Sequence, residues 1–116
     1  MLAREYRLPA TTKLIHAQFT RTSLFGLKYT QNNLSVSRFA FVVRKSVDKR
    51  AVTRNRIRRV FRSCIEELLL QIVPGHDMLF FLEKGIIDVT RAEVLKEVSR
   101  TLAEKRLLIK NEKNNH

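Results

Sequence analysis

Several features that would point to particular protein classes are scarce or missing in this sequence. Among 116 residues there is one cysteine, Cys64, and there is no tryptophan. A single cysteine cannot form an internal disulfide, and alone it cannot build a metal site. No stretch approaches the roughly 18 apolar residues of a membrane-spanning helix. The charged first residues are not followed by the apolar segment of a secretory signal. We therefore expect a soluble, cytoplasmic protein with no membrane partner.

Glycine and groups for acid–base chemistry are also sparse. The three glycines, Gly26, Gly75 and Gly85, are scattered and form no loop that could cradle a phosphate. The chain lacks the RNP1 aromatic box and the GXXG loop of common single-strand RNA modules. The candidate acid–base residues are widely spaced: His16, His76, Asp77, Glu83 and His116. Because a protein nuclease needs such groups or a bound metal to converge, we expect no catalytic residue, metal site, tightly bound cofactor or small-molecule substrate.

Positive charge is what the sequence has in excess. It has 23 lysines and arginines against 11 acidic residues, a net charge of +12. The hydrophobic fraction of 44% is typical of a folded chain, and the length fits one domain, which we place at 1–109 with a disordered polar tail at 110–116. Such a charge excess indicates a phosphate-rich partner.

Periodicity and turn signals predict alternating helices and strands. Leu14, Ile15 and Phe19 have helical spacing, and Thr90 with Glu93 forms a capping box that begins the last helix. The predicted elements are helices over 10–20 and 52–72 and from residue 90 onward, and strands over 24–30, 36–44 and 78–82. This order is α-β-β-α-β-α, with room for one more strand within 24–37, and indicates an α+β fold.

The strand at 36–44 has two different faces. Phe39, Phe41 and Val43 point one way and are expected in the core. The other face carries Arg38, Ala40, Val42 and Arg44. The small alanine between two arginines predicts an open face that is accessible to an anion.

The charge is concentrated between residues 38 and 62. This window holds ten basic residues and one acidic residue, Asp48, and so carries nine of the twelve net charges. On the helix at 52–72 the apolar face comprises Ile57, Phe61, Cys64, Ile65, Leu68 and Ile72, whereas Asn55, Arg58, Arg59 and Arg62 lie opposite, flanked by Arg54 and Arg56. These cations repel one another, and the helix dipole also disfavours them. A solvated basic face without a partner is the alternative, but the charge density favours a nucleic acid.

The residues at 51–62 resemble a known family signature. Ala51-Val52-Thr53-Arg54-Asn55-Arg56-Ile57-Arg58-Arg59, followed by Arg62, is similar to the motif of the bacterial ribonuclease P protein family, in which a basic loop precedes Ala-Val-x-Arg-Asn-Arg-Ile-Lys/Arg-Arg. A weaker resemblance extends through Arg7-Leu8, Phe41-Val42-Val43 and the turn with Pro74, Gly75 and Asp77.

The resemblance implies a fold, a function and an RNA-binding surface. The fold is an α-β-β-β-α-β-α two-layer sandwich, like that of some ribosomal proteins, with a left-handed β-α-β crossover. The function is that of a protein subunit: the family's catalytic RNA, which requires Mg²⁺, removes the 5′ leader of precursor tRNA. The residues implied to contact this RNA are Lys45, Lys49, Arg50, Arg54, Asn55, Arg56, Arg58, Arg59 and Arg62.

The resemblance also implies a leader cleft between the first helix and the sheet. Two departures affect it, because Ser46 stands where the family usually has a second lysine, and Ile15 precedes Phe19 where a second phenylalanine is common. The candidate cleft residues are Ile15, Phe19, Tyr29, Arg38, Ala40, Val42 and Arg44. The competing hypothesis is a non-catalytic RNA-binding protein of ribosomal type, which would show no dependence on the leader.

Overall fold

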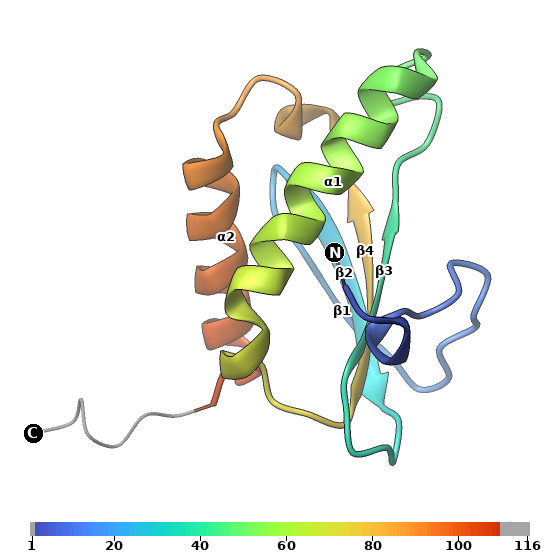
Figure 1. Cartoon of the computed structure of the whole chain (residues 1–116), viewed down its shortest axis with the longest axis vertical. Coiled ribbons are helices and arrows are strands. Elements are labelled where there is room, and N and C mark those ends of the chain that lie inside the picture. Colours follow the sequence, from blue (N-terminus) through green and yellow to red (C-terminus); the bar gives the residue numbers. More distant parts are fainter. Residues whose placement is uncertain (1, 110–116) are drawn as a thin grey trace, which may run out of the picture.

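The computed structural model describes residues 2–109 of the chain. One face of a four-stranded sheet is covered by two helices (Figure 1). The strands are β1 (Gln18–Arg21), β2 (Phe25–Gln31), β3 (Arg38–Val42) and β4 (His76–Leu82), and the helices are α1 (Ala51–Leu68) and α2 (Arg91–Glu104). Three short 3-10 turns, η1 (Arg4–Tyr6), η2 (Leu69–Gln71) and η3 (Lys84–Ile86), complete the elements. The predicted disordered tail lies outside the described residues.

The last strand in the chain lies inside the sheet. The strand order is β1-β2-β4-β3, and β4 pairs antiparallel with β2 and parallel with β3. Helix α1 therefore connects two parallel neighbours. When α1 lies in front and both strands point upward, β4 is to the left of β3 (Figure 1), so the crossover is left-handed. Most such crossovers are right-handed, and the fold expected from the resemblance is confirmed.

The main core fills the space between the sheet and the helices. Phe61 of α1 is fully buried, and its ring centroid lies 4.9 Å from that of Phe80 and 5.4 Å from that of Phe25. The core residues that surround these rings include Leu27, Phe39, Val43, Ile57, Cys64, Ile65, Met78, Val94, Val98 and Leu102. The predicted apolar face of α1 and inner face of β3 are therefore confirmed.

The helix predicted at residues 10–20 is wrong. Residues 10–17 contain no helix, and Gln18–Arg21 form strand β1, which pairs with β2. His16 has a positive φ of 54°, which ends any helix at this point. The apolar residues with helical spacing instead pack separately, because Leu14 is buried on the sheet while Ile15 is exposed. The first helical element is η1, so the order implied by the resemblance is kept with a shorter first helix placed earlier. The additional strand is β1, which lies before the range 24–37 in which it was expected.

Local signals located the other elements well. Thr90 Oγ1 accepts a hydrogen bond of 3.2 Å from the backbone nitrogen of Glu93, as the predicted cap of α2 requires. Strand β4 starts at His76, two residues before the apolar run, because His76 pairs with Gln31 of β2. Among residues 2–109, no helix is both long and apolar enough to cross a membrane.

Candidate nucleic-acid interface

The basic loop before α1 is organised around its one carboxylate. Asp48 accepts hydrogen bonds from the backbone nitrogen of Arg50 at 2.8 Å and from the Arg50 guanidinium at 2.9 Å. These bonds, the side-chain one foremost, lower the pKa of Asp48 to about 2. Arg54 Nη1 donates to the carbonyls of Asp48 and Lys49 at 2.9 and 2.8 Å. Arg54 therefore closes the loop onto the helix, while Lys45, Lys49 and Arg50 remain exposed.

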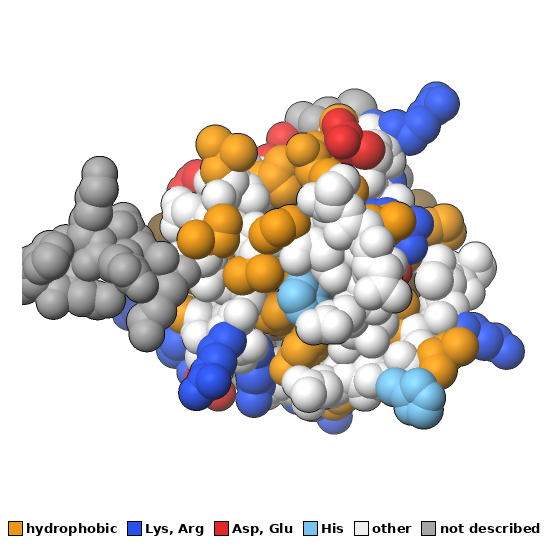
Figure 2. Space-filling model, turned by 90° about the horizontal axis from the view of Figure 1, so that it is seen from below, with side chains coloured by type: hydrophobic (Ala, Val, Ile, Leu, Met, Phe, Trp, Pro, Cys, Tyr) orange, Lys and Arg blue, Asp and Glu red, His pale blue; other side chains and the backbone are white. Residues whose placement is uncertain are grey.

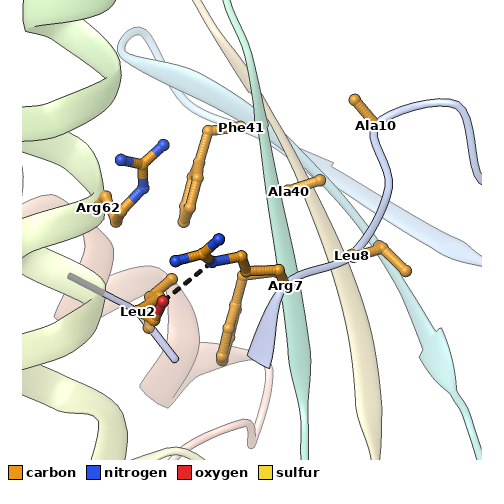
Figure 3. Close-up of a pocket in the computed structure, with 8 residues that line it drawn as sticks. Leu2, Arg7, Leu8, Ala10, Ala40, Phe41 and Arg62 are labelled. Atoms are coloured by element: carbon orange, nitrogen blue, oxygen red, sulfur yellow. Dashed lines mark hydrogen bonds between the residues drawn. The ribbon is translucent and has the colours of Figure 1, made fainter. Parts of the chain in front are cut away.

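The sequence-predicted RNA-binding residues of α1 form one surface, which we call the basic helix surface: Arg54, Asn55, Arg56, Arg58, Arg59 and Arg62. Arg58 donates a hydrogen bond to the side chain of Asn55. Arg54, Arg58 and Arg62 follow one another at intervals of one helical turn. Arg62, the last of them, lies over the ring of Phe41 with its guanidinium carbon 5.9 Å from the ring centroid (Figure 3). The helix thus carries an arginine at each of three successive turns, and the first of them is bonded to the preceding loop.

The arginines of this surface form no ion pair within residues 2–109, although the nearby Asp48 carboxylate interacts with the charge of Arg54. The lysine and arginine side chains with a carboxylate partner in the described part of the chain are Arg21, Arg38, Arg50, Arg91, Arg100 and Lys105. None of these belongs to the basic helix surface. Like charges on one helix face destabilise it when nothing offsets them. The arrangement is therefore suited to an external anion, in particular one with many phosphates.

The opposite end of the molecule has a different character. Figure 2 shows this end, where α1 finishes: hydrophobic side chains gather on it, and most lysines and arginines lie toward its rim. Leu70 of η2, directly after α1, is almost fully exposed, and Leu34 and Ile109 are also exposed. The positive charge of the chain is thus displayed unevenly, with its greatest density along the first turns of α1.

A second candidate surface lies on the face of the sheet that points away from the helices. Phe19 of β1 packs over Gly26, where an added Cβ would lie 3.1 Å from the ring of Phe19. Phe81 flanks the same glycine, and the guanidinium carbon of Arg44 lies 5.6 Å from the Phe81 ring centroid. Val42 pairs with Phe81 and lines a hollow of about 270 Å³ together with Arg44. We call Phe19, Val42, Arg44 and Phe81 the far-face patch.

The structure corrects three of the predicted cleft residues. Ala40 is only 4% exposed because Leu8 and Leu14 of the N-terminal segment cover it, so its face of β3 is not open there. Tyr29 is 8% exposed and packs in the main core, on the helix side of the sheet, where its hydroxyl donates to Gln18 Oε1 at 2.6 Å. Burial raises the pKa of Tyr29. Ile15 is 71% exposed, but it lies in a turn and not on a helix beside the sheet.

Arg38 is on the predicted face but is engaged with a buried carboxylate. Its Nε and Nη2 atoms donate to the two oxygens of Asp77 at 2.9 and 2.8 Å, and Asn32 Nδ2 donates to the same carboxylate at 2.8 Å. Burial alone would raise the pKa of Asp77, but the bonds from Arg38 and Asn32 and the charge of Arg38 outweigh it, and the pKa is lowered. Arg38 therefore fastens β3 to β4.

Phe81 is the patch residue that sequence reasoning missed. It belongs to the apolar run that becomes β4, in which Met78, Phe80 and Leu82 are core residues. The period of two along a strand would have placed Phe81 on the other face. The sequence therefore contained a signal for the orientation of Phe81. Its place beside Phe19, Val42 and Arg44 follows from the pairing of the strands.

Comparison with known proteins shows the family to which this chain belongs. A profile of the family described as Ribonuclease P matches residues 12–106. The ribonuclease P protein component of Microcystis aeruginosa is 33% identical over 72 residues, which are 62% of this chain and 60% of that protein. That of a Synechocystis species is 28% identical over 120 residues, covering 94% of this chain and 97% of that protein. The matched segment thus spans about three fifths of the Microcystis relative and nearly all of the Synechocystis one.

Solved structures show the same fold at low sequence identity. The RNase P protein from Thermotoga maritima superposes with a TM-score of 0.75 and 19% identity, over 83% of this chain and 94% of that one. The RNase P protein from Staphylococcus aureus superposes with a TM-score of 0.71 and 19% identity, over 96% of this chain and 97% of that one. Because the family profile matches residues 12–106, which include the whole sheet and both helices, this chain belongs to the ribonuclease P protein family.

Proposed function

We propose that this chain is the protein subunit of a ribonuclease P and assists the removal of the 5′ leader from precursor tRNA. The observation that carries the proposal is the basic helix surface, which combines the Ala51–Arg62 pattern with guanidinium groups that have no carboxylate partner among the described residues. In this proposal the partner is the catalytic RNA, which performs the hydrolysis with Mg²⁺ ions, and the complex acts in the cytoplasm.

The basic helix surface would hold the catalytic RNA through its phosphates. An arginine fork can donate two parallel hydrogen bonds to one phosphate, which a lysine cannot do. Asn55 projects between these arginines and can reach a base edge or a sugar. Neutralising several phosphates releases counterions, so the affinity should fall steeply as salt is raised.

The far-face patch would hold the leader of the precursor. Phe19 is 58% exposed and offers a ring face, while Phe81 and Arg44 lie on the other side of Gly26. Aromatic side chains stack with unpaired bases of any sequence, and arginine adds a phosphate contact. Such a patch suits an extended single strand, which is the form a leader takes upstream of the folded tRNA.

The test is cleavage of precursor tRNA by a bacterial ribonuclease P RNA at low Mg²⁺, with and without the full-length protein. We expect strong stimulation, the mature 5′ end as product, and no cleavage by the protein alone. The same assay with leaders of one and ten nucleotides should show that the protein favours the longer leader. Stimulation without leader dependence would contradict the role of the far-face patch, and no stimulation would favour an RNA-binding protein of ribosomal type.

A further inference from the structure

A pocket lies between α1 and the N-terminal segment, at the outer edge of β3. It has a volume of about 340 Å³, and its walls are Leu2, Arg7, Leu8, Ala10, Phe39, Ala40, Phe41 and Arg62. In Figure 3 the guanidinium groups of Arg7 and Arg62 both lie between β3 and α1, next to the ring of Phe41. One guanidinium comes from the N-terminal segment and the other from α1, and no wall residue is acidic.

Both guanidinium groups have hydrogen-bonding capacity to spare. Arg7 Nε donates to the carbonyl of Leu2 at 3.0 Å, which fixes the direction of the side chain and leaves its two terminal nitrogens facing the pocket. Arg62 contacts the Phe41 ring. No described carboxylate forms an ion pair with either arginine. Two neighbouring cations repel each other unless an anion lies between them, and paired forks suit a tetrahedral phosphate.

The N-terminal segment passes from one side of the sheet to the other at this pocket. Leu2 is buried in the main core on the helix side, whereas Leu8 and Leu14 are buried on the far face. Between them the segment crosses the edge of β3, where the Leu8 nitrogen donates to the Phe39 carbonyl at 2.8 Å. The segment then leads into β1, which carries Phe19 of the far-face patch. Arg7 thus lies at the crossing point between the two candidate RNA-binding surfaces.

We propose that Arg7 and Arg62 together bind one RNA phosphate, and that this phosphate fastens the N-terminal segment to α1. The inference rests on the proposed function, because RNA supplies the phosphate. This contact would couple RNA binding to the leader-binding surface. RNA held in the pocket fixes the position at which the N-terminal segment crosses β3, and it thereby fixes the position of β1, which carries Phe19. The protein then arranges its leader-binding surface when the RNA docks.

The experiment measures binding of the full-length protein to a bacterial ribonuclease P RNA at several KCl concentrations. The variants are Arg7→Ala, Arg62→Ala and the double variant, with Arg4→Ala as a control that removes a charge from the same segment outside the pocket. We expect Arg7→Ala and Arg62→Ala each to lower the affinity for the RNA by about tenfold and to make the affinity less dependent on the KCl concentration. Because the two arginines share one phosphate, the double variant should lose clearly less than the product of the single losses.

The coupling has its own readout. With saturating RNA, amide hydrogen exchange across residues 8–17 should slow in the wild type and in Arg4→Ala but not in Arg7→Ala. Arg7→Lys keeps the positive charge but lacks the two-pronged guanidinium, so its affinity for the RNA should lie between those of Arg7→Ala and the wild type. If Arg7→Ala does not fold, Arg7→Lys replaces it in both measurements. Repeating the binding measurement with precursor tRNA added shows which RNA supplies the phosphate. If the variants lose affinity with the catalytic RNA alone, that RNA supplies it; if they lose affinity only when a precursor with a leader is present, the leader supplies it.

The outcomes separate this inference from the proposed function. If Arg7→Ala behaves like Arg4→Ala both with the catalytic RNA alone and with precursor tRNA added, or if the losses in the double variant are strictly multiplicative, the shared phosphate is overturned. If the wild-type protein itself neither binds the catalytic RNA nor stimulates cleavage, the proposed function fails, whatever the variants do.

Discussion

The basic helix surface and the far-face patch are built in different ways. The first belongs to one continuous helix and consists mainly of guanidinium groups that form no ion pair with a carboxylate of residues 2–109. The second is assembled from β1, β3 and β4 and the stretch after β3, and it is mainly aromatic and apolar. The comparison teaches that a surface within one element follows from local spacing, whereas a surface made from several strands depends on which strands become neighbours.

The two surfaces should also differ in how they respond to solution conditions. Contacts between arginine and phosphate weaken as counterions become abundant, whereas stacking of a base on an aromatic ring is much less sensitive to salt. Salt dependence therefore offers a direct way to separate the two surfaces experimentally.

The largest effect should follow from removing charge on the basic helix surface. The triple variant Arg56→Ala, Arg58→Ala and Arg59→Ala should lose about 100- to 1000-fold in affinity for the catalytic RNA, with a salt slope lower by about three. Filter binding over a KCl series measures both. The matched control removes three cations near or on α2, at Lys96, Arg100 and Lys105, and equal losses in the two variants would mean that total charge alone determines binding.

A smaller effect should follow from Asp77→Asn, which removes the charge that holds Arg38. We expect the free energy of unfolding to fall by on the order of 2 kcal/mol at pH 7. Because the folded-state pKa of Asp77 is lowered, its stabilisation is present above the ordinary carboxyl pKa and is lost as pH falls through the folded value. Urea unfolding at pH 7 and pH 3 should show that the difference in free energy of unfolding between wild type and variant becomes smaller in acid. A difference that does not change with pH would mean that it does not come from the charge of Asp77.

Replacing Phe19 by alanine tests the far-face patch. The preference for precursor over mature tRNA should fall by about tenfold, since stacking on one aromatic ring contributes about 1–3 kcal/mol. The salt slope should stay unchanged, in contrast to the arginine variant. Leu34→Ala, which shortens another exposed apolar side chain, serves as the control. A reduced salt slope for Phe19→Ala would mean that the two surfaces are not separate.

The smallest functional effect should come from Tyr29→Phe. Because the Tyr29 ring packs on the helix side of the sheet, leader preference should remain within twofold of the wild type. The lost hydrogen bond to Gln18 should lower the free energy of unfolding by about 1 kcal/mol. Thermal unfolding and precursor binding, measured side by side, check both parts, and a large loss of leader preference would return Tyr29 to the leader cleft.

The sequence predicted those parts of the fold in which the signal lies within one element. The 3.6-residue period of α1 and the cap at Thr90 are local, and both located their helices. The alternation of apolar residues at Phe25, Leu27 and Tyr29 likewise indicated that Tyr29 faces the main core. The basic helix surface was therefore predictable residue by residue.

The N-terminal segment could not be predicted in the same way. Leu14, Ile15 and Phe19 fit a helical period, but pairing with β2 outweighs that weak local preference. The cover over Ala40 comes from Leu8 and Leu14, about thirty residues earlier in the chain, and no local pattern around Ala40 indicates it. The pocket between Arg7 and Arg62 depends on the same long-range packing.

The position of β4 in the middle of the sheet also determines the order in which the chain can fold during synthesis. Strands β2 and β3 are made first but never pair with each other, and the strand that joins them emerges more than thirty residues after β3 ends. Until then the N-terminal segment, which bridges to Phe39, can pair with one edge of β3, but the other edge has no partner, and α1 must cross over before β4 can insert. Nascent chains with unpaired strand edges are prone to associate. The arginines of α1 are synthesised within this interval, and their mutual repulsion would keep neighbouring nascent chains apart before any RNA is bound.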